Sequence, residues 1–291
     1  MTSGHITSRE LGRTGIGIFP IGLGAMPLSL RGRPNERAAV GVIHAALDAG
    51  VTFIDTANAY CIDARDVGHN ERLIASALRQ WKGSGKITVA TKGGLIRPSG
   101  AWETEGRPDH LRKACEQSLR DLGVETIYLY QLHTPDGRVA WADQVGELAR
   151  LQAEGKIRHI GLSNVSTAEL RQALAIVRVE SVQNRCNPSD QGDLKSGLVR
   201  VCADEGVTYL PYSPVGGHNG HKRMGRQRAL AQLAKRHGTS PQCIMLAWLL
   251  GKGAHVVPIP GASRVASITD SCRAVEVRLS AEDAAQVDAM G

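Results

Sequence analysis

Short apolar runs recur along the 291-residue chain, and each is followed by polar residues and then by a stretch with helical periodicity. Continuous apolar runs of a few residues are typical of parallel strands that are buried on both faces. Candidate strands of this kind lie at Ile21–Leu23, Val51–Ile54, Ile87–Ala90, Ile127–Tyr130, Ile157–Leu162, Ser181–Gln183, Val207–Pro211 and Val256–Ile259.

The stretches between these runs predict amphipathic helices. In the first of them Val40, Ile43, Ala46 and Leu47 share one helical face, and Gly50 follows as a C-terminal cap. The same spacing predicts helices at Glu36–Ala49, Glu71–Trp81, Pro108–Leu122, Trp141–Glu154, Thr167–Val177, Leu194–Asp204, Arg226–Arg236 and Pro241–Leu250.

Alternating strands and helices predict a parallel sheet with right-handed crossovers. Because the units are spread evenly, they favour a closed (β/α)8 barrel of the TIM type, with an open doubly wound sheet as the alternative. Before the first strand, Leu11-Gly12 and Ile16–Phe19 flank Arg13-Thr14-Gly15, which predicts a short N-terminal β-hairpin at the bottom of the barrel. No linker, repeat or low-complexity segment interrupts the pattern, so residues 1–291 are expected to form one domain.

Composition narrows the class of protein. Hydrophobic residues make up 42% of the chain, which is ordinary for a globular protein. The formal charge of +7 is spread over many segments and aromatic residues make up only 4%, so we expect no nucleic-acid partner. The basic run His221-Lys222-Arg223 is interpreted as a solvated loop.

No segment indicates a membrane or a metal. No apolar run approaches the roughly 20 residues that a membrane span needs, and positions 1–10 lack the apolar core of a signal peptide, so we expect a cytoplasmic protein. The six cysteines show no C-x-x-C spacing, which predicts buried free thiols and no metal site. Nothing in the sequence indicates an oligomeric state.

Residues with useful chemistry follow several of the predicted strands. Asp55 and Tyr60 follow the second strand, Lys92 the third and His133 the fourth. In a (β/α)8 barrel the carboxyl ends of the strands meet at one rim, and active sites lie there. Each residue taken alone is as readily a helix cap, a surface charge or a histidine with a structural partner. Together, an acid, a tyrosine, a lysine and a histidine on one rim predict an active site.

The four side chains predict proton transfer to an oxygen. A tyrosine with an ordinary pKa of about 10 is a poor proton donor at neutral pH, and a neighbouring ammonium group lowers such a pKa by about 1–3 units. Lys92 is expected to act on Tyr60 in this way, with Asp55 holding Lys92 charged. A neutral imidazole at His133 would orient a substrate carbonyl. Tyr60 is then a general acid that protonates the oxygen as negative charge develops there.

Motifs along the chain match one known family in order and spacing. They are Gly22-Leu23-Gly24-Ala25-Met26, Asp55-Thr56-Ala57 with Tyr60, Ala90-Thr91-Lys92, Leu132-His133, Gly155-Lys156-Ile157-Arg158 before Gly161-Leu162-Ser163-Asn164, Val182-Gln183-Asn184, Pro211-Tyr212-Ser213-Pro214 and Pro258-Ile259-Pro260-Gly261. On these motifs the chain resembles the aldo-keto reductases over essentially its full length. The run from Gln131 to Val165 is most similar to bacterial members of the pyridoxal-reductase-like branch.

The resemblance implies a TIM barrel that binds NADP(H) without a Rossmann fingerprint and reduces an aldehyde or ketone to an alcohol. It implies Tyr60 as the general acid, with Asp55, Lys92 and His133 as its partners. The resemblance implies that the nicotinamide carboxamide is contacted by Ser163, Asn164 and Gln183. It implies that the ring of Tyr212 stacks on nicotinamide and that the residues after Tyr212 form the loop near the pyrophosphate. The implied cofactor contacts are Gly24, Met26, Asp55, Ser163, Asn164, Gln183, Tyr212, Ser213, Pro214, Val215, Gly216, Ser263, Arg264 and Asp270.

The segment after Gly261 departs from the family pattern. Ser267 stands where the family has an arginine for the adenosine 2′-phosphate, and Asp270-Ser271 replaces Glu-Asn. Arg264 is the nearby cation that remains, and arginine pairs bidentately with phosphate. The sequence therefore predicts a weakened preference for NADPH, with an NAD(H)-preferring alcohol or sugar dehydrogenase as an alternative.

Substrate contacts are expected from loops at the rim. We expect Met26 and Trp102 to wall the pocket, although simple loop packing explains both equally well. Two further functions stay open: a cofactor-binding redox-sensing regulatory subunit with little turnover, and a barrel isomerase or lyase without nicotinamide. The loops concerned are Met26–Arg33, Cys61–His69, Gly93–Arg107 and Pro135–Ala140.

Overall fold

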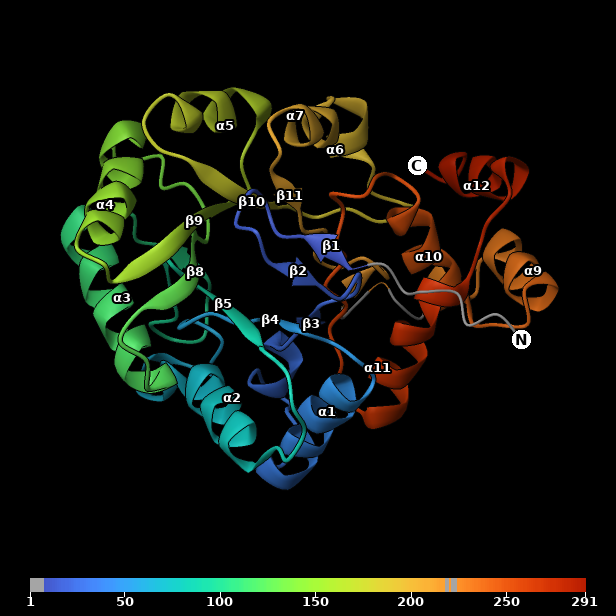
Figure 1. Ribbon diagram of the computed structural model, residues 1–291, viewed down its shortest axis with the longest axis horizontal. Coiled ribbons are helices and arrows are strands. Elements are labelled where there is room, and N and C mark those ends of the chain that lie inside the picture. The colour runs from blue at the N-terminus through green and yellow to red at the C-terminus, as the bar shows by residue number, and fades with distance from the viewer. Residues whose placement is uncertain (1–7, 218–219, 221–223) are drawn as a thin grey trace.

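The computed structural model describes residues 8–217, 220 and 224–291 of the chain. The run His221-Lys222-Arg223, which the sequence predicts to be a solvated loop, lies outside the described residues. Strands alternate with helices along the described chain, and the helices surround the strands (Figure 1).

One parallel sheet holds seven strands in the order β11-β10-β9-β8-β5-β4-β3. Each strand pairs with the neighbour that precedes or follows it among the strands of this sheet, so the strands advance steadily around the barrel. Their bounds are β3 (Leu23–Gly24), β4 (Phe53–Asp55), β5 (Thr88–Gly93), β8 (Ile127–Leu132), β9 (Ile157–Ser163), β10 (Val179–Gln183) and β11 (Thr208–Tyr209).

Residues 255–261 close the barrel between the two ends of this sheet. On one side Tyr209 forms a parallel bridge with Val256, and on the other Gly24 forms a parallel bridge with Gly261. The eighth apolar run therefore lies where an eighth strand is predicted. The (β/α)8 barrel is confirmed, and the alternative of an open doubly wound sheet is excluded.

The closing segment is not a regular strand because of its two prolines. The N–H groups of Gly22 and Gly24 donate to the carbonyls of Pro258 and Pro260, both at 3.0 Å. Neither proline has an N–H to return a bond to β3, so only half of that ladder forms. In place of the predicted strand over Val256–Ile259, the closing segment has two isolated bridges, at Val256 and at Gly261.

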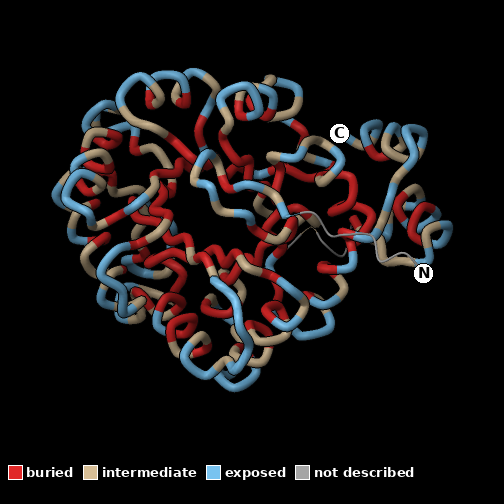
Figure 2. The backbone as a smooth tube through the Cα atoms, in the orientation of Figure 1, coloured by how far each residue is buried: buried red, intermediate tan, exposed pale blue. Residues whose placement is uncertain are grey.

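The helices cover the outside of the barrel and turn their apolar faces to it, while their outer faces are exposed (Figure 2). None of the helices in the described part of the chain is long and apolar enough to cross a membrane. Their bounds are α1 (Glu36–Asp48), α2 (His69–Gln80), α3 (Pro108–Leu122), α4 (Trp141–Ala153), α5 (Thr167–Leu174), α6 (Gly192–Lys195), α7 (Leu198–Asp204), α9 (Arg228–Arg236), α10 (Pro241–Leu250), α11 (Val265–Cys272) and α12 (Ala281–Asp288), with short 3-10 helices η1 (Met26–Leu28), η2 (Ala64–Asp66) and η3 (Arg273–Glu276).

The helices differ from the sequence prediction in places. The helix predicted over Leu194–Asp204 is split into α6 and α7, because Gly197 between them has φ +81° and breaks the helical path. Helix α11 was not predicted, since its sequence mixes serine, threonine and aspartate with few apolar positions.

A hairpin of β1 (Arg9–Glu10) and β2 (Gly17–Ile18) closes the amino-terminal end of the barrel, in front of the strands in Figure 1. Leu11 and Ile18 are fully buried and belong to one apolar cluster with residues from inside the barrel, including Phe53 and Leu129. The predicted hairpin at the barrel bottom is confirmed. The opposite end of the barrel is therefore the open one.

Candidate active site

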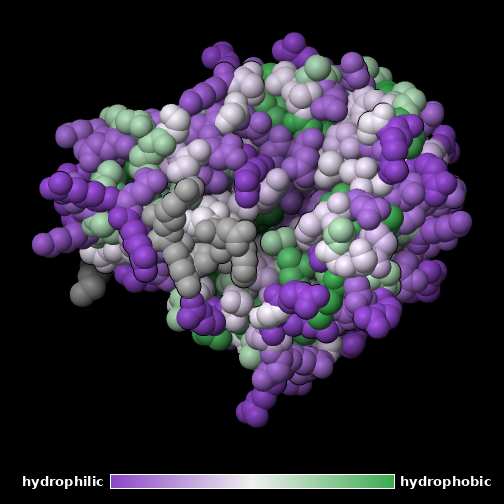
Figure 3. Space-filling model, turned by 180° about the vertical axis from the view of Figure 1, so that it is seen from behind, coloured by the Kyte–Doolittle hydropathy of each residue, from purple (hydrophilic) through white to green (hydrophobic). Residues whose placement is uncertain are grey.

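The predicted catalytic residues lie at the open end of the barrel, where the surface is hollowed near its centre (Figure 3). Asp55 is the last residue of β4, and Lys92 is the last but one of β5. The carboxyl ends of neighbouring parallel strands meet at one rim, which brings these side chains together. Three more inward-facing polar residues come from the next strands along the sheet, namely Gln131 of β8, Ser163 of β9 and Gln183 of β10.

Lys92 is the centre of the arrangement. Its side chain is fully buried, and its Nζ donates to Asp55 Oδ2 at 2.7 Å, to the Thr56 carbonyl at 2.8 Å and to Tyr60 OH at 3.0 Å. An ammonium group has three hydrogens, so all three are used. The lysine is therefore held in one position with its charge satisfied inside the protein.

Asp55 is held from its other oxygen. Its Oδ1 accepts a hydrogen bond from Gln183 Nε2 at 2.7 Å and a longer one from Gln131 Nε2 at 3.3 Å. A buried carboxylate is costly unless it is paired and hydrogen-bonded, and here it is both. Gln183, which the sequence assigns to the cofactor, thus also holds the ion pair.

Tyr60 lies against Lys92, but its titration differs from the expectation. Burial raises the pKa of Tyr60 well above its ordinary value, and the negative charge of Asp55 raises it further. The shift is therefore opposite to the predicted lowering by Lys92, because desolvation penalises the phenolate of a ring that is only 6% exposed. Burial also lowers the pKa of Lys92, against the opposing effect of Asp55. Tyr60 therefore keeps its proton at neutral pH.

His133 completes the group of four. Its ring centroid lies 5.6 Å from that of Tyr60, with the two rings nearly perpendicular at 79°. Burial, and then the positive charge of Lys92, holds the pKa of His133 well below its ordinary value. The imidazole is therefore neutral, as expected from the sequence. Its Nδ1 is buried without a hydrogen-bond partner among the described residues.

The predicted nicotinamide contacts form a connected group beside His133. Asn164 has φ +59°, and its Nδ2 donates to the His133 carbonyl at 2.9 Å and to Ser163 Oγ at 3.1 Å. Tyr212 OH donates to Asn164 Oδ1 at 2.9 Å. The structure thus brings Tyr212 to Ser163 and Asn164, from which it is far apart in the sequence.

The loop after Tyr212 makes a tight turn. Ser213 has φ +48°, and the Gly216 N–H donates back to the Ser213 carbonyl at 3.0 Å. Pro214 is buried, and Val215 packs against the core. Ser213 and Gly216 therefore hold their backbone in a bend at the rim, where the sequence places the pyrophosphate loop.

The remaining predicted cofactor residues have different surroundings. Ser263 and Arg264 are exposed and directly precede α11, whose first turn has no side-chain cap. Asp270 lies at the other end of this helix, and its carboxylate accepts a hydrogen bond from Ser240 Oγ at 2.6 Å, at the start of α10. Asp270 is therefore separated along α11 from Ser263 and Arg264.

Gly24 and Met26 lie at the carboxyl end of β3. A Cβ on Gly24 would approach the Ile259 carbonyl to 2.8 Å, so this glycine is required where residues 255–261 close the barrel. Met26 begins η1 and is half-buried.

A second hairpin, which the sequence did not predict, extends from the end of β5. It consists of β6 (Leu95–Ile96) and β7 (Glu103–Thr104). Trp102 precedes β7, and its ring centroid lies 6.4 Å from that of Tyr60 and 6.3 Å from that of His133. Arg97 lies on the Trp102 ring, with its guanidinium carbon 3.9 Å from the ring centroid. The hairpin thus places Trp102, an expected pocket wall, beside two predicted catalytic residues.

Another buried carboxyl lies on the outer side of β5. Thr91, the neighbour of Lys92, donates from its Oγ1 to Glu71 Oε1 at 2.5 Å. Glu71 is fully buried on α2, and burial raises its pKa from 4.5 to about 7. The two successive residues of β5 therefore contact buried acids on opposite faces of the sheet.

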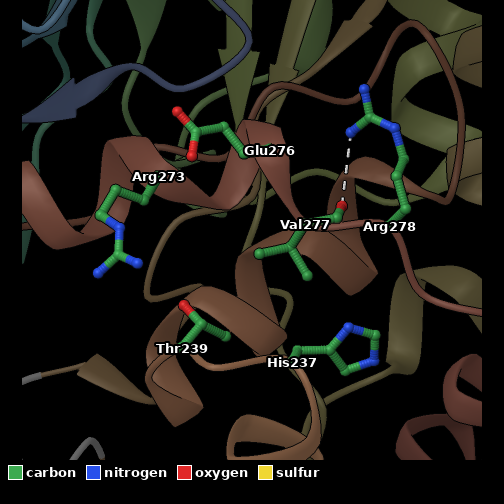
Figure 4. Close-up of a pocket in the computed structure, with 6 residues that line it drawn as sticks. All are labelled: His237, Thr239, Arg273, Glu276, Val277 and Arg278. Carbon is green, nitrogen blue, oxygen red and sulfur yellow. Dashed lines mark hydrogen bonds between the residues drawn. The ribbon is translucent and has the colours of Figure 1, made fainter. Parts of the chain in front are cut away.

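A pocket of about 230 Å³ lies elsewhere, between the α9–α10 connection and η3 (Figure 4). None of the predicted catalytic residues lines it. The side chains of its two arginines point in different directions in the close-up, and they do not converge on a common point. The lining residues are His237, Thr239, Arg273, Glu276, Val277 and Arg278.

Comparison with known proteins agrees with this geometry. The model of the aldo/keto reductase family matches residues 20–291. A Glycine max protein named "probable aldo-keto reductase 1" is 33% identical to this chain, over 99% of it and 89% of the plant protein. A thermostable aldo-keto reductase, solved with the inhibitor epalrestat, is 30% identical with a TM-score of 0.82, covering 98% of this chain and 99% of the other.

A third match is a Klebsiella pneumoniae aldo-keto reductase solved in complex with NADPH. It is 23% identical with a TM-score of 0.81, over 98% of this chain and 94% of the other, and it shows the same fold. Because the family model and the relatives span almost the entire sequence, the chain belongs to the aldo/keto reductase family of oxidoreductases.

Proposed function

We propose that this protein reduces an aldehyde or ketone to the alcohol with NADPH, and that Tyr60 supplies the proton. The observation that carries the proposal is the buried contact of Lys92 with both Asp55 at 2.7 Å and Tyr60 at 3.0 Å. A buried lysine that donates a hydrogen bond to a tyrosine hydroxyl can stabilise the phenolate that forms when the tyrosine gives up its proton. This arrangement therefore supports proton transfer by Tyr60.

The residues at the open end fit a nicotinamide cofactor. Tyr212 offers a ring at the rim, and Asn164 and Ser163 offer an amide and a hydroxyl beside it. The first turn of α11 has no side-chain cap, so the N–H groups of its first two residues, Val265 and Ala266, and the exposed Arg264 are available to a phosphate. The Klebsiella protein with the same fold binds NADPH.

The bound nicotinamide supplies the hydride that the carbonyl carbon accepts. The chain's own residues manage the oxygen. An N–H of the neutral His133 imidazole orients the carbonyl, and the Tyr60 hydroxyl transfers its proton to the oxygen as the C=O bond becomes C–OH. Lys92, bonded to the Tyr60 oxygen, stabilises the phenolate that is left, and Asp55 keeps the ammonium group in place.

The proposal is tested by following NADPH oxidation with a panel of aldehydes, ketones and sugars. We expect turnover by the parent protein. In Tyr60→Phe we expect a loss of at least about 10³-fold, with NADPH affinity within about twofold, since the general acid is removed and the cofactor contacts remain. Activity at a tenth of the parent rate would show that Tyr60 is not the acid.

The same assay separates the alternative functions. NADPH binding without turnover of any carbonyl favours the regulatory subunit, and tighter binding and faster turnover with NADH favour the NAD(H)-dependent dehydrogenase. Tryptophan fluorescence that neither cofactor quenches is the result that an isomerase or lyase without nicotinamide predicts.

A further inference from the structure

Arg97, at the end of β6, is a buried cation without a carboxylate partner. Only 7% of the residue is exposed, yet no aspartate or glutamate in the described part of the chain forms an ion pair with it. Its Nη1 is buried and has no hydrogen-bond partner among the described residues. A guanidinium group has five N–H donors and no acceptor, so its natural partners are carboxylates, phosphates and carbonyl oxygens.

The contacts that hold Arg97 are to neutral groups. Its Nε donates to the Gly100 carbonyl at 2.9 Å, and its Nη2 donates to the Ile62 carbonyl at 3.3 Å. Gly100 has φ +88°, which turns the hairpin so that its carbonyl faces back to Arg97. These bonds fix the side chain but leave its positive charge without a counter-charge.

The acids of the neighbouring loop are paired with other arginines. Asp63, which directly follows Ile62, pairs with Arg65 at 2.8 Å, and Asp66 pairs with Arg33 at 2.5 Å. An isolated buried charge is costly to a folded protein, and natural proteins pair such charges or use them to bind a ligand. The described part of the fold therefore supplies no negative charge that neutralises Arg97.

Trp102 connects Arg97 to the reacting groups. The guanidinium lies 3.9 Å from the centroid of the Trp102 ring, and the same ring faces Tyr60 and His133 edge-on. Trp102 is 44% exposed, so the indole that lies on Arg97 is not packed into the core. Trp102 therefore contacts Arg97 with the face of its ring and lies beside Tyr60 and His133, so an anion that takes the place of the indole meets the guanidinium.

We propose that the substrates of this site are carbonyl compounds that carry an anionic group, a carboxylate or a phosphate, which Arg97 binds. This inference rests on the proposed function, because it concerns the carbonyl that Tyr60 protonates. The planar guanidinium presents paired donors that match both carboxylate and phosphate. The short path through Trp102 selects small molecules whose anion lies only a few bonds from the carbonyl.

The first test compares matched substrates in the NADPH assay. The pairs are 4-oxobutanoate with butanal for a carboxylate, and glyceraldehyde 3-phosphate with glyceraldehyde for a phosphate. We expect kcat/KM to be about 10- to 100-fold higher for the charged member of at least one pair, which is the range of a charge-assisted hydrogen bond. The pair with the larger ratio identifies which anion is bound. Equal values within both pairs would overturn the proposal.

Variants then assign the preference to Arg97. Arg97→Gln should reduce the ratio of charged to uncharged substrate to near one, mainly through KM, and Arg97→Lys should restore part of it. Arg107→Gln is the matched control, because it removes one positive charge from an exposed arginine that is already paired with Glu105. It should leave the ratio unchanged. A ratio that falls equally in both glutamine variants would show a general effect of net charge and would refute a specific site.

A binding measurement keeps this proposal separate from the proposed function. 4-Hydroxybutanoate is titrated into the protein with NADP⁺ bound, and the tryptophan fluorescence is recorded for the parent and for Arg97→Gln. We expect a saturable change in the parent that is lost in Arg97→Gln. If no carbonyl is turned over but this binding holds, the proposed function fails and the anion site stands. If butanal is turned over but 4-hydroxybutanoate binding does not depend on Arg97, the proposed function stands and the anion site fails.

Discussion

Lys92 and Arg97 are two buried cations on the same segment of chain, and they are satisfied in opposite ways. Lys92 is fully buried, pairs with Asp55 and uses all three of its hydrogens within the protein. Arg97 is only slightly more exposed, but it binds two neutral carbonyls and leaves Nη1 without a partner in the described structure.

The difference separates two uses of buried charge. A cation whose partners are all in the protein is held in place before any ligand arrives, and it can act on a reacting group at no cost of reorganisation. A cation that lacks a counter-charge gains its best partner only when a ligand supplies one. Lys92 therefore belongs to the proposed chemistry and Arg97 to the proposed recognition of substrate.

Among the variants that test this comparison of buried charges, the largest effect is expected from Lys92→Met. The change removes the charge that stabilises the Tyr60 phenolate, and kcat should fall by at least about 10²-fold. It also leaves Asp55 buried without its ion-pair partner, which should lower the free energy of unfolding by about 3–5 kcal/mol. Single-turnover NADPH oxidation and urea unfolding measure the two effects.

The exposed Lys82→Met is the control, since it removes a lysine without a buried partner. In the double variant Asp55→Asn with Lys92→Met, neither member of this pair carries a buried charge, so stability should recover in part while activity does not. A double variant as unstable as Lys92→Met would show that packing, and not the unpaired carboxylate, caused the loss.

A smaller effect is expected from Glu71→Gln, which tests the buried carboxyl on the other face of β5. The folded-state pKa of Glu71 is about 7, against 4.5 ordinarily, so the folded protein holds this proton more tightly than the unfolded chain does. Its contribution to stability is complete below about pH 4.5 and is lost as the pH rises through 7. Between pH 5 and pH 8 the parent should lose about 2–3 kcal/mol that Glu71→Gln does not lose.

Urea unfolding at the two pH values measures this difference. Glu125→Gln, at an exposed position, should keep the slope of the parent. Parallel stability curves for the parent and Glu71→Gln would mean that Glu71 titrates as an ordinary surface acid does.

The smallest effect is expected from Arg264→Ala, which removes an exposed cation just before α11. NADPH should bind up to about tenfold more weakly, because one arginine–phosphate contact at an exposed site contributes no more than about 1.4 kcal/mol. NADH binding should change less than twofold. Arg273→Ala, just beyond the other end of α11, is the matched control, and fluorescence titration measures both cofactors. Equal or tighter binding of NADH by the parent would contradict the predicted NADPH preference.

The order of the strands was readable from the sequence because it depends on local patterns. Apolar runs followed by helical periodicity place the strands and most helices, and a barrel then brings Asp55, Lys92 and His133 to one rim. Where the local pattern failed, a specific residue explains it. Pro258 and Pro260 turned a predicted strand into bridges, and Gly197 divided a predicted helix.

The candidate site was readable only in part, because burial and counter-charges are tertiary properties. The sequence contains no sign that Tyr60 is desolvated enough to raise its pKa, so the lowering expected from Lys92 was wrong in direction. Arg97 was missed because its hairpin has two-residue strands that leave no periodic pattern. Its lack of an acid is visible only once Asp63 and Asp66 are seen to pair with other arginines.

The closure of the barrel by residues 255–261 has a consequence for how the protein is made. Synthesis begins at the N-terminus, so β3 leaves the ribosome long before the segment that pairs with it. Until that segment emerges, β3 and β11 are open sheet edges with unpaired backbone groups, which are prone to join other chains. For most of its synthesis the nascent chain therefore contains an incomplete sheet. Pro258 and Pro260 in the closing segment lack N–H groups, which also keeps that segment from forming a regular strand with a neighbouring chain.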